Sequence, residues 1–135
     1  MIRQAFDIGE HDWRFEVWYD VRTDDDLQEV YECLLDAGMT MRKANVALQV
    51  LTGYNHGLTY TVFGDRRTLM FMSKTTSAEQ MYDSIQHETR HAADHVGEYY
   101  GLAARGEEQA YLQGEIARKM FPAAAMVVCP RCHQE

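Results

Sequence analysis

The residues best suited to chemistry in this sequence are His87, Glu88 and His91, which form the pattern His-Glu-x-x-His. Side chains four residues apart project from the same face of a helix, so both imidazoles can reach one metal ion. Glu88, one step round from His87, lies beside the water that such an ion would hold. Zn²⁺ with three protein ligands acidifies that water and polarises a carbonyl, while a nearby carboxylate accepts the proton. The pattern predicts a zinc site with Glu88 as general base.

This geometry requires a helix, and the surrounding residues predict one from Ser77 to Gly101. Ser77 and Gln80 match a capping box, in which the hydroxyl accepts from the third helical amide and the glutamine reaches back. A match by chance, with solvated histidines on an exposed helix, is the competing interpretation. The helical setting favours the metal site. An apolar stripe continues along the helix: Met81, Ile85, Ala92, Val96 and Tyr99.

The elements around this helix predict an α+β fold with a small antiparallel sheet. Alternation of aromatic and β-branched residues is typical of strands, and apolar residues at three- and four-residue spacing are typical of helices. Thr23 can cap the first helix, whose first turn is acidic. The predicted elements are a strand Trp13–Val21, helices Thr23–Gly38 and Thr40–Leu51, a hairpin of Leu58–Phe63 and Thr68–Ser73, and a helix Gly106–Phe121 that Pro122 ends.

The chain of 135 residues has the size of one folding unit, so we expect one domain over residues 1–122 and a C-terminal tail over 123–135. The tail contains Cys129, Cys132 and His133 in the pattern CxxCH. Haem attachment uses this pattern in exported proteins, and half of a zinc ribbon lacks its second ligand pair. We therefore expect a disordered tail, with a second metal site as the alternative.

The composition describes an ordinary globular protein, with 46% apolar and 25% charged residues. Twenty-one acidic against 13 basic residues give a net charge of −8, which argues against non-specific binding to nucleic acid or anionic membranes. The sequence has neither an apolar run long enough to span a membrane nor a recognisable export signal. Three cysteines do not suggest a disulfide framework. We expect a cytoplasmic protein, and its oligomeric state is not indicated.

The order of hairpin, HExxH helix, short loop and glutamate-bearing helix resembles the core of the gluzincin-type zincins, which are zinc metallopeptidases. The resemblance covers about Leu58–Phe121 and is closest to small, largely uncharacterised metallopeptidase-like proteins of bacteria and phages. Their downstream helix reads like Glu107–Gly114. The resemblance implies a zincin-like core, hydrolysis of peptide or protein substrates, and a hairpin strand at the rim of the site that pairs with extended substrate.

In this family the third zinc ligand is a glutamate on the next helix, and three residues are candidates. Glu107 shares its helix face with small residues, which would permit close approach to the HExxH helix, and the family pattern also favours Glu107. Glu108 shares its face with Glu115, a less convincing contact surface. An antiparallel helix pair would instead place Glu115 opposite His91. We expect Glu107 as the ligand, with Glu108 and Glu115 as alternatives.

Two further residues of the same helix are candidates for supporting roles. Asp94 follows His87 by seven residues and so returns to the metal-facing side, where it could orient a ligand imidazole. A solvated acidic residue is the alternative. His95, one turn after His91, could be a ligand, but the metzincin pattern requires its third histidine at the position of Gly97.

Two functions therefore compete. The first is a zinc-dependent metallopeptidase in which Glu88 activates the water that attacks a peptide carbonyl. The second is a catalytically silent, zinc-stabilised binding or regulatory domain, because so short a chain leaves little for the far wall of a substrate cleft.

Overall fold

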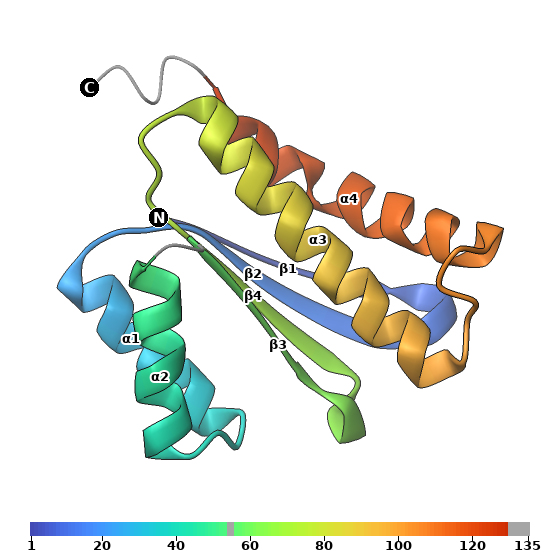
Figure 1. The fold of residues 1–135 in the computed structure, drawn as a ribbon, viewed down its shortest axis with the longest axis horizontal. Helices are drawn as coiled ribbons and strands as arrows, with labels where there is room; N and C mark the ends of the chain where they lie inside the picture. The colour runs from blue at the N-terminus through green and yellow to red at the C-terminus, as the bar shows by residue number, and fades with distance from the viewer. Residues whose placement is uncertain (54–55, 130–135) are drawn as a thin grey trace.

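The computed structural model describes residues 1–53 and 56–129, which form an α+β fold of one sheet and two pairs of long helices (Figure 1). The α+β part of the predicted fold class is confirmed. The elements are β1 (Ile2–Ile8), β2 (Trp13–Val21), α1 (Asp24–Asp36), α2 (Met41–Thr52), β3 (Gly57–Val62), β4 (Arg67–Ser73), α3 (Ala78–Tyr100) and α4 (Glu107–Val127). Two short 3-10 turns, Gly9–His11 and Phe63–Asp65, connect β1 to β2 and β3 to β4.

The sheet is mixed, with the strand order β1-β2-β4-β3. Each hairpin is antiparallel, whereas the two central strands, β2 and β4, are parallel and come from the two halves of the chain. Parallel neighbours need a long crossover connection, which α1, α2 and β3 provide here. The fold therefore differs from the purely antiparallel sheet that we expected, and it leaves β1 and β3 at the edges.

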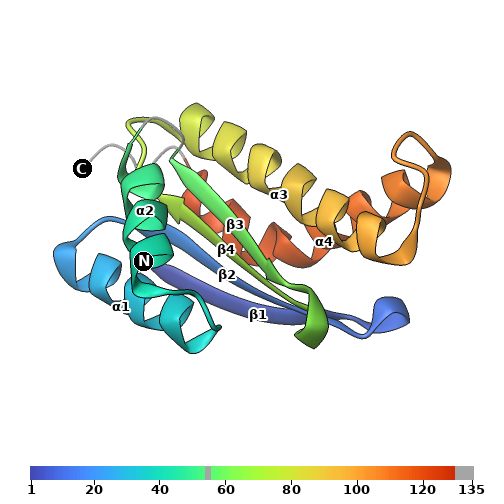
Figure 2. The ribbon, with the colours of Figure 1, turned by 60° about the horizontal axis from the view of Figure 1, so that its bottom comes forward.

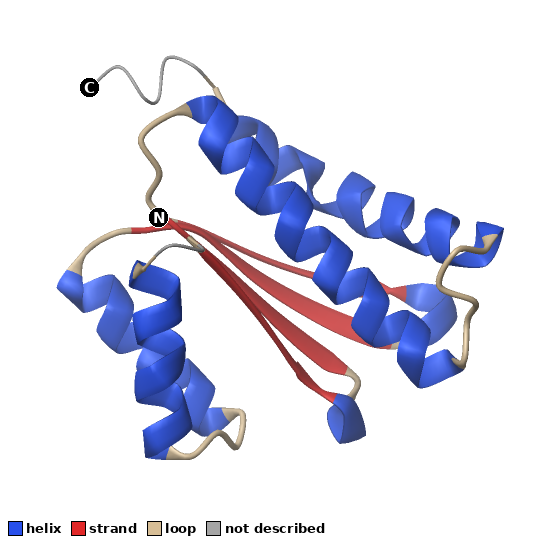
Figure 3. Cartoon of the chain, viewed as in Figure 1, coloured by secondary structure: helices blue, strands red, loops and turns tan. Residues whose placement is uncertain are grey.

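The helices cover both faces of the sheet, α3 and α4 on one side and α1 and α2 on the other (Figures 1–3). Successive strand residues point to opposite faces, so each central strand contributes to two apolar cores. Phe15 and Met70 belong to the core under α3 and α4, whereas Trp18 and Phe71 belong to the core under α1 and α2.

The residues predicted to cap the starts of α1 and α3 do so, but the contacts of Gln80 differ from the prediction. Thr23 and Asp26 form a reciprocal capping box at the start of α1. At the start of α3, Ser77 Oγ accepts from the backbone N–H of Gln80 at 3.1 Å. The Gln80 side chain, however, accepts from Thr76 instead of Ser77, so the predicted capping box is only half formed.

Strand β1 was not predicted, although it pairs with β2 along its whole length, from Ile2 opposite Tyr19 to Ile8 opposite Trp13. Every second residue of the strand is at least partly buried. Phe6 stacks on a β2 phenylalanine with ring centroids 5.2 Å apart. This alternation was the available signal, but polar Gln4 on the buried side and apolar Ala5 on the exposed side obscured it.

Helix α4 continues through Pro122 to Val127, so the predicted helix end at Phe121 is wrong. Proline inside a helix removes one backbone hydrogen bond. Ala123 and Val127 nevertheless lie buried in the core, and their burial favours continuation of the helix. Cys132 and His133 lie outside the described residues. Neither α4 nor any other helix in the described part is long and apolar enough to cross a membrane.

Candidate metal and catalytic site

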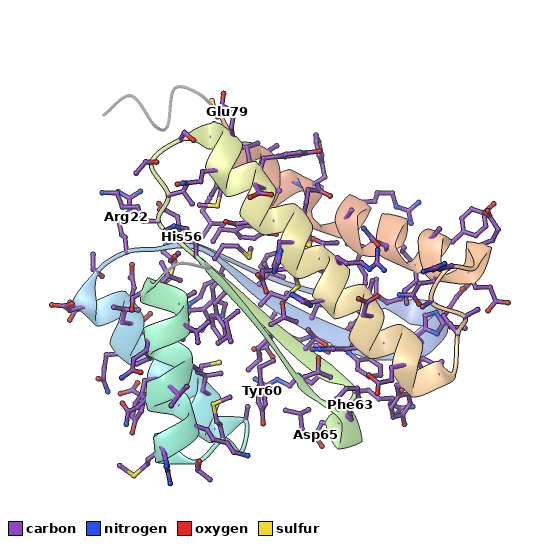
Figure 4. The ribbon with its side chains drawn as sticks, viewed as in Figure 1. Arg22, His56, Tyr60, Phe63, Asp65 and Glu79 are labelled. Atoms are coloured by element: carbon purple, nitrogen blue, oxygen red, sulfur yellow. The ribbon has the colours of Figure 1, made fainter. Side chains whose placement is uncertain are left out.

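The HExxH segment lies on α3 where this helix packs along the edge strand β3. The residues of β3 that face α3 are Gly57, Thr59 and Thr61, as their contacts with α3 side chains demonstrate. Tyr60 points away from α3, and it packs in the opposite core (Figure 4). The alternation of β3 therefore presents a glycine and two threonines to the helix.

The two histidines converge as the four-residue spacing predicts. Their Nε2 atoms are 3.0 Å apart, and their rings are nearly perpendicular at 76°. The His87 side chain is 60% exposed. Two nitrogens bound to one tetrahedral zinc ion at 2.0–2.1 Å would be about 3.3 Å apart. A small rotation of either ring would provide this spacing, so the pair fits a zinc ion reached from solvent.

Glu88 is only 3% exposed and lies between the helix and β3. Its Oε1 accepts a hydrogen bond from Thr59 Oγ1 at 2.8 Å, while Oε2 is 4.0 Å from His87 Nε2. Gly57 provides the necessary space, because a Cβ there would be 2.6 Å from Oε2. Burial raises the pKa of Glu88, and the Thr59 bond and the two histidines partly oppose this rise.

None of the three candidate third ligands, Glu107, Glu108 and Glu115, lies beside the histidine pair. In the described residues no group of three His, Cys, Asp or Glu side chains is placed to hold a metal. Helix α3 extends to Tyr100, and α4 returns antiparallel to it: Gln109 contacts Gly97, and Met120 contacts Thr89. Glu107, the first residue of α4, therefore lies near the far end of α3.

Glu108 and Glu115 lie on another side of α4. They line a surface hollow together with Glu10 and His11, which follow β1. Helix α4 packs against β1 and β2, whereas α3 packs against β3 and β4. The two glutamates therefore face the sheet edge opposite the histidine pair.

In this structure the hydrogen-bond partners of Asp94 are Arg90 and Gln109 and not an imidazole. Its carboxylate accepts from Arg90 Nε at 3.0 and 3.2 Å, and from Gln109 Nε2 at 3.5 Å. Gln109 also donates to the backbone carbonyl of Ala93 at 2.8 Å. Asp94 thus links the exposed side of α3 to α4.

A buried hydrogen-bond chain that the sequence did not indicate leads from the core to His95. Trp13 Nε1 donates to Thr68 Oγ1 at 2.9 Å, Thr68 Oγ1 is 2.9 Å from Thr61 Oγ1, and Thr61 Oγ1 is 2.8 Å from His95 Nδ1. Burial, reinforced by nearby His91, lowers the pKa of His95. The spacing Gly57-x-Thr59-x-Thr61 was the signal for a polar strand face, but only the fold identifies its partners.

The structure thus brings together two solvent-facing imidazoles and one buried, oriented carboxylate beside an edge strand. Zinc prefers imidazole nitrogen, and a nearby carboxylate is a suitable proton acceptor, so these groups fit a hydrolytic metal site. Comparisons of the chain with protein-family models, curated proteins and solved structures found no match.

Proposed function

We propose that this protein is a zinc-dependent metallopeptidase of zincin-like fold, in which His87 and His91 bind the metal and Glu88 is the general base. The observation that carries the proposal is the convergence of the two Nε2 atoms at 3.0 Å, with a Glu88 oxygen 4.0 Å from one of them. We also propose that the protein is cytoplasmic, as expected from its sequence.

The contacts of Glu88 suit a base. Thr59 holds one carboxylate oxygen, which leaves Oε2 directed toward the histidine pair. Burial raises the pKa of Glu88, and a carboxylate with a raised pKa accepts a proton more readily near neutral pH. Bound zinc would supply Lewis acidity toward a carbonyl and lower the pKa of a water ligand. Glu88 would take the water proton and later deliver it to the leaving amine.

The edge strand β3 supports a peptide as the substrate. In the described residues β3 pairs only with β4, so its outer edge keeps backbone donors and acceptors for another strand. Extended peptides commonly bind by adding a strand to such an edge. Because α3 packs along β3, a peptide on this edge would lie close to the histidines.

The decisive experiment substitutes Glu88 by Gln and measures zinc content together with cleavage of a peptide library. We expect zinc binding to persist and turnover to fall by about 10²–10⁴-fold, the usual contribution of a general base. Glu98→Gln, the same change at an exposed position of α3, is the matched control and should retain activity. Equal turnover in both variants would exclude Glu88 from the mechanism.

The alternative function is a zinc-stabilised binding domain without turnover. The observation that favours it is the two-histidine set, to which no third His, Cys, Asp or Glu side chain of the described residues is added. Stoichiometric zinc binding that raises the melting temperature, with no cleavage of any library peptide by the unmodified protein, would establish this alternative.

A further inference from the structure

We infer that His95 is a fixed hydrogen-bond donor that binds a carbonyl oxygen of the peptide through Nε2, and that it is not a metal ligand. This inference rests on the proposed function for the identity of its acceptor. The state of the imidazole itself follows from the buried chain that ends at His95 Nδ1.

The direction of the hydrogen bonds in this chain follows from counting hydrogens. Trp13 Nε1–H can only donate, so Thr68 Oγ1 accepts at that contact. If Thr68 donates to Thr61 and Thr61 donates to His95, every hydroxyl hydrogen has an acceptor. If His95 Nδ1 instead carried a hydrogen and donated to Thr61, one threonine hydrogen would have no acceptor within the chain.

That second arrangement is costly because Thr68 is fully buried and Thr61 is nearly so. A buried donor without an acceptor loses its hydration without compensation. Neither hydroxyl makes another hydrogen bond in the described part of the protein. The chain therefore selects the neutral imidazole with its hydrogen on Nε2, whose in-plane lone pair is on Nδ1.

The Nε2–H group of His95 is accessible from outside. Among the described residues, the buried side-chain polar atoms without a partner are Ser73 Oγ and Gln109 Oε1. Within the described residues His95 Nε2 makes no hydrogen bond and is not one of these buried atoms, so it is at least partly exposed. A nitrogen that carries a hydrogen cannot bind zinc, which assigns His95 to donation.

The position of His95 suits a carbonyl of the same peptide. Four helical residues, from His91 to His95, advance about 6 Å along α3. An extended peptide advances about 6.6 Å over two residues, and carbonyls two residues apart point to the same side. Thr59 contacts Glu88 and Thr61 contacts His95, so β3 and α3 run in the same direction here. His95 would thus meet a carbonyl two residues from the cleaved bond.

The first test is the tautomer, read from long-range ¹H–¹⁵N correlations of the labelled full chain. The His95 signals are those absent from His95→Gln. We expect the Nε2–H tautomer without zinc and, after addition of zinc, shifts of the His87 and His91 nitrogens while His95 keeps its Nε2–H. An Nδ1–H tautomer, or metal-bound His95 nitrogen, would overturn the inference. Thr61→Val should lose the tautomer preference.

The second test compares two substitutions in the zinc-loaded enzyme. In His95→Gln the amide oxygen can accept from Thr61 and the amide nitrogen can donate, so kcat/KM should remain within about 3-fold of the unmodified value. His95→Phe lacks the donor and should lose about 10-fold in kcat/KM, mainly through a higher KM. Both variants should bind zinc as tightly as the unmodified protein.

Two outcomes of this comparison would contradict the role of His95. Equal kinetics of the Phe and Gln variants would remove the peptide contact, and loss of zinc from His95→Gln would make His95 a ligand. An unmodified protein that binds zinc but cleaves no peptide would overturn the proposed function and the peptide contact with it. The tautomer would still be decided by the spectra alone.

Discussion

Helices α3 and α4 lie side by side on the same face of the sheet and contribute apolar residues to the same core, but α3 also meets the sheet through buried polar pairs (Figures 1 and 2). Helix α3 meets β3 through two polar pairs, Glu88 with Thr59 and His95 with Thr61. Helix α4 contributes mainly apolar side chains to this core, among them Leu112, Ile116 and Met120.

We interpret this difference as a division of roles, in which the polar pairs of α3 serve reactivity and the apolar side chains of α4 serve stability. Buried carboxyl and imidazole groups cost desolvation, which hydrogen bonds offset only in part, whereas buried aliphatic groups contribute directly to stability. The α3–β3 interface is therefore a poor place to gain stability, and we propose that its polar pairs are retained for reactivity. The α4 side holds α3 in place.

Removal of a histidine should have the largest effect on the α3 side. His87→Ala deletes a proposed ligand from an exposed position, so zinc affinity should fall by about 100-fold or more, with little change in the stability of the metal-free protein. Isothermal titration with zinc and chemical unfolding check the two halves of this prediction. A variant that keeps its zinc affinity would contradict the proposed site.

The α4 side should show the opposite behaviour. Ile116 is fully buried, so Ile116→Ala should lower the free energy of unfolding by about 2–4 kcal/mol through lost burial and an unfilled cavity. At a temperature where the variant remains folded, its zinc affinity should be nearly unchanged. Urea unfolding followed by circular dichroism measures the loss, and a loss below about 1 kcal/mol would contradict the assigned role of α4.

A methyl group at Gly57 should perturb the interface between β3 and Glu88. The new Cβ would be 2.6 Å from Glu88 Oε2, so Gly57→Ala should destabilise the protein by about 1–3 kcal/mol and displace the carboxylate. In the background of Glu88→Ala the same substitution should cost much less, since the clashing atoms are absent. The four proteins form a double-mutant cycle, and simple additivity would show that the two residues do not interact.

The pH dependence of stability offers a smaller but specific test. The pKa of Glu88 in the fold is raised by burial, so the folded protein holds this proton more tightly than the unfolded chain does. The metal-free protein should therefore lose stability relative to Glu88→Gln as the pH rises through the range between the two pKa values, above about 4.5. Unfolding at pH 4 and pH 7 measures the difference. A difference independent of pH would contradict the raised pKa.

Substitutions of the α4 glutamates should have the smallest effect. Glu107→Gln, Glu108→Gln and Glu115→Gln should each retain zinc affinity within about 3-fold, because the structure places these side chains away from the histidine pair. Competition with a coloured chelator measures the affinities. A large loss confined to Glu107→Gln would restore Glu107 as the ligand that the family resemblance implies.

Much of the fold was predictable because its signals are local. Thr23 and Ser77 cap the helices that they were expected to begin, and β2 has the predicted bounds. The HExxH geometry is also local, since it depends only on helical spacing. The predictions were wrong where contacts between distant residues determine the structure. Strand β1 depends on pairing with β2, and α4 continues past Pro122 because Ala123 and Val127 are buried.

The rest of the site depends on how the elements pack together. Thr59 and Thr61 acquire their roles only because β3 lies beside α3. The register between α3 and α4 is fixed by contacts such as Gln109 against Gly97, where a Cβ would be 2.0 Å from the amide oxygen. This register determines which glutamates approach the histidines, and no periodicity along the sequence specifies it.

The parallel pairing of β2 with β4 has a consequence for any attempt to shorten the chain. Strand β4 is buried on both sides along most of its length, and its neighbour β2 comes from the first half of the sequence. A fragment that begins at β3 would expose the β4 edge with its apolar residues Leu69 to Met72. Exposed, apolar strand edges promote aggregation. The second half of the chain should therefore form aggregates when expressed without the first half.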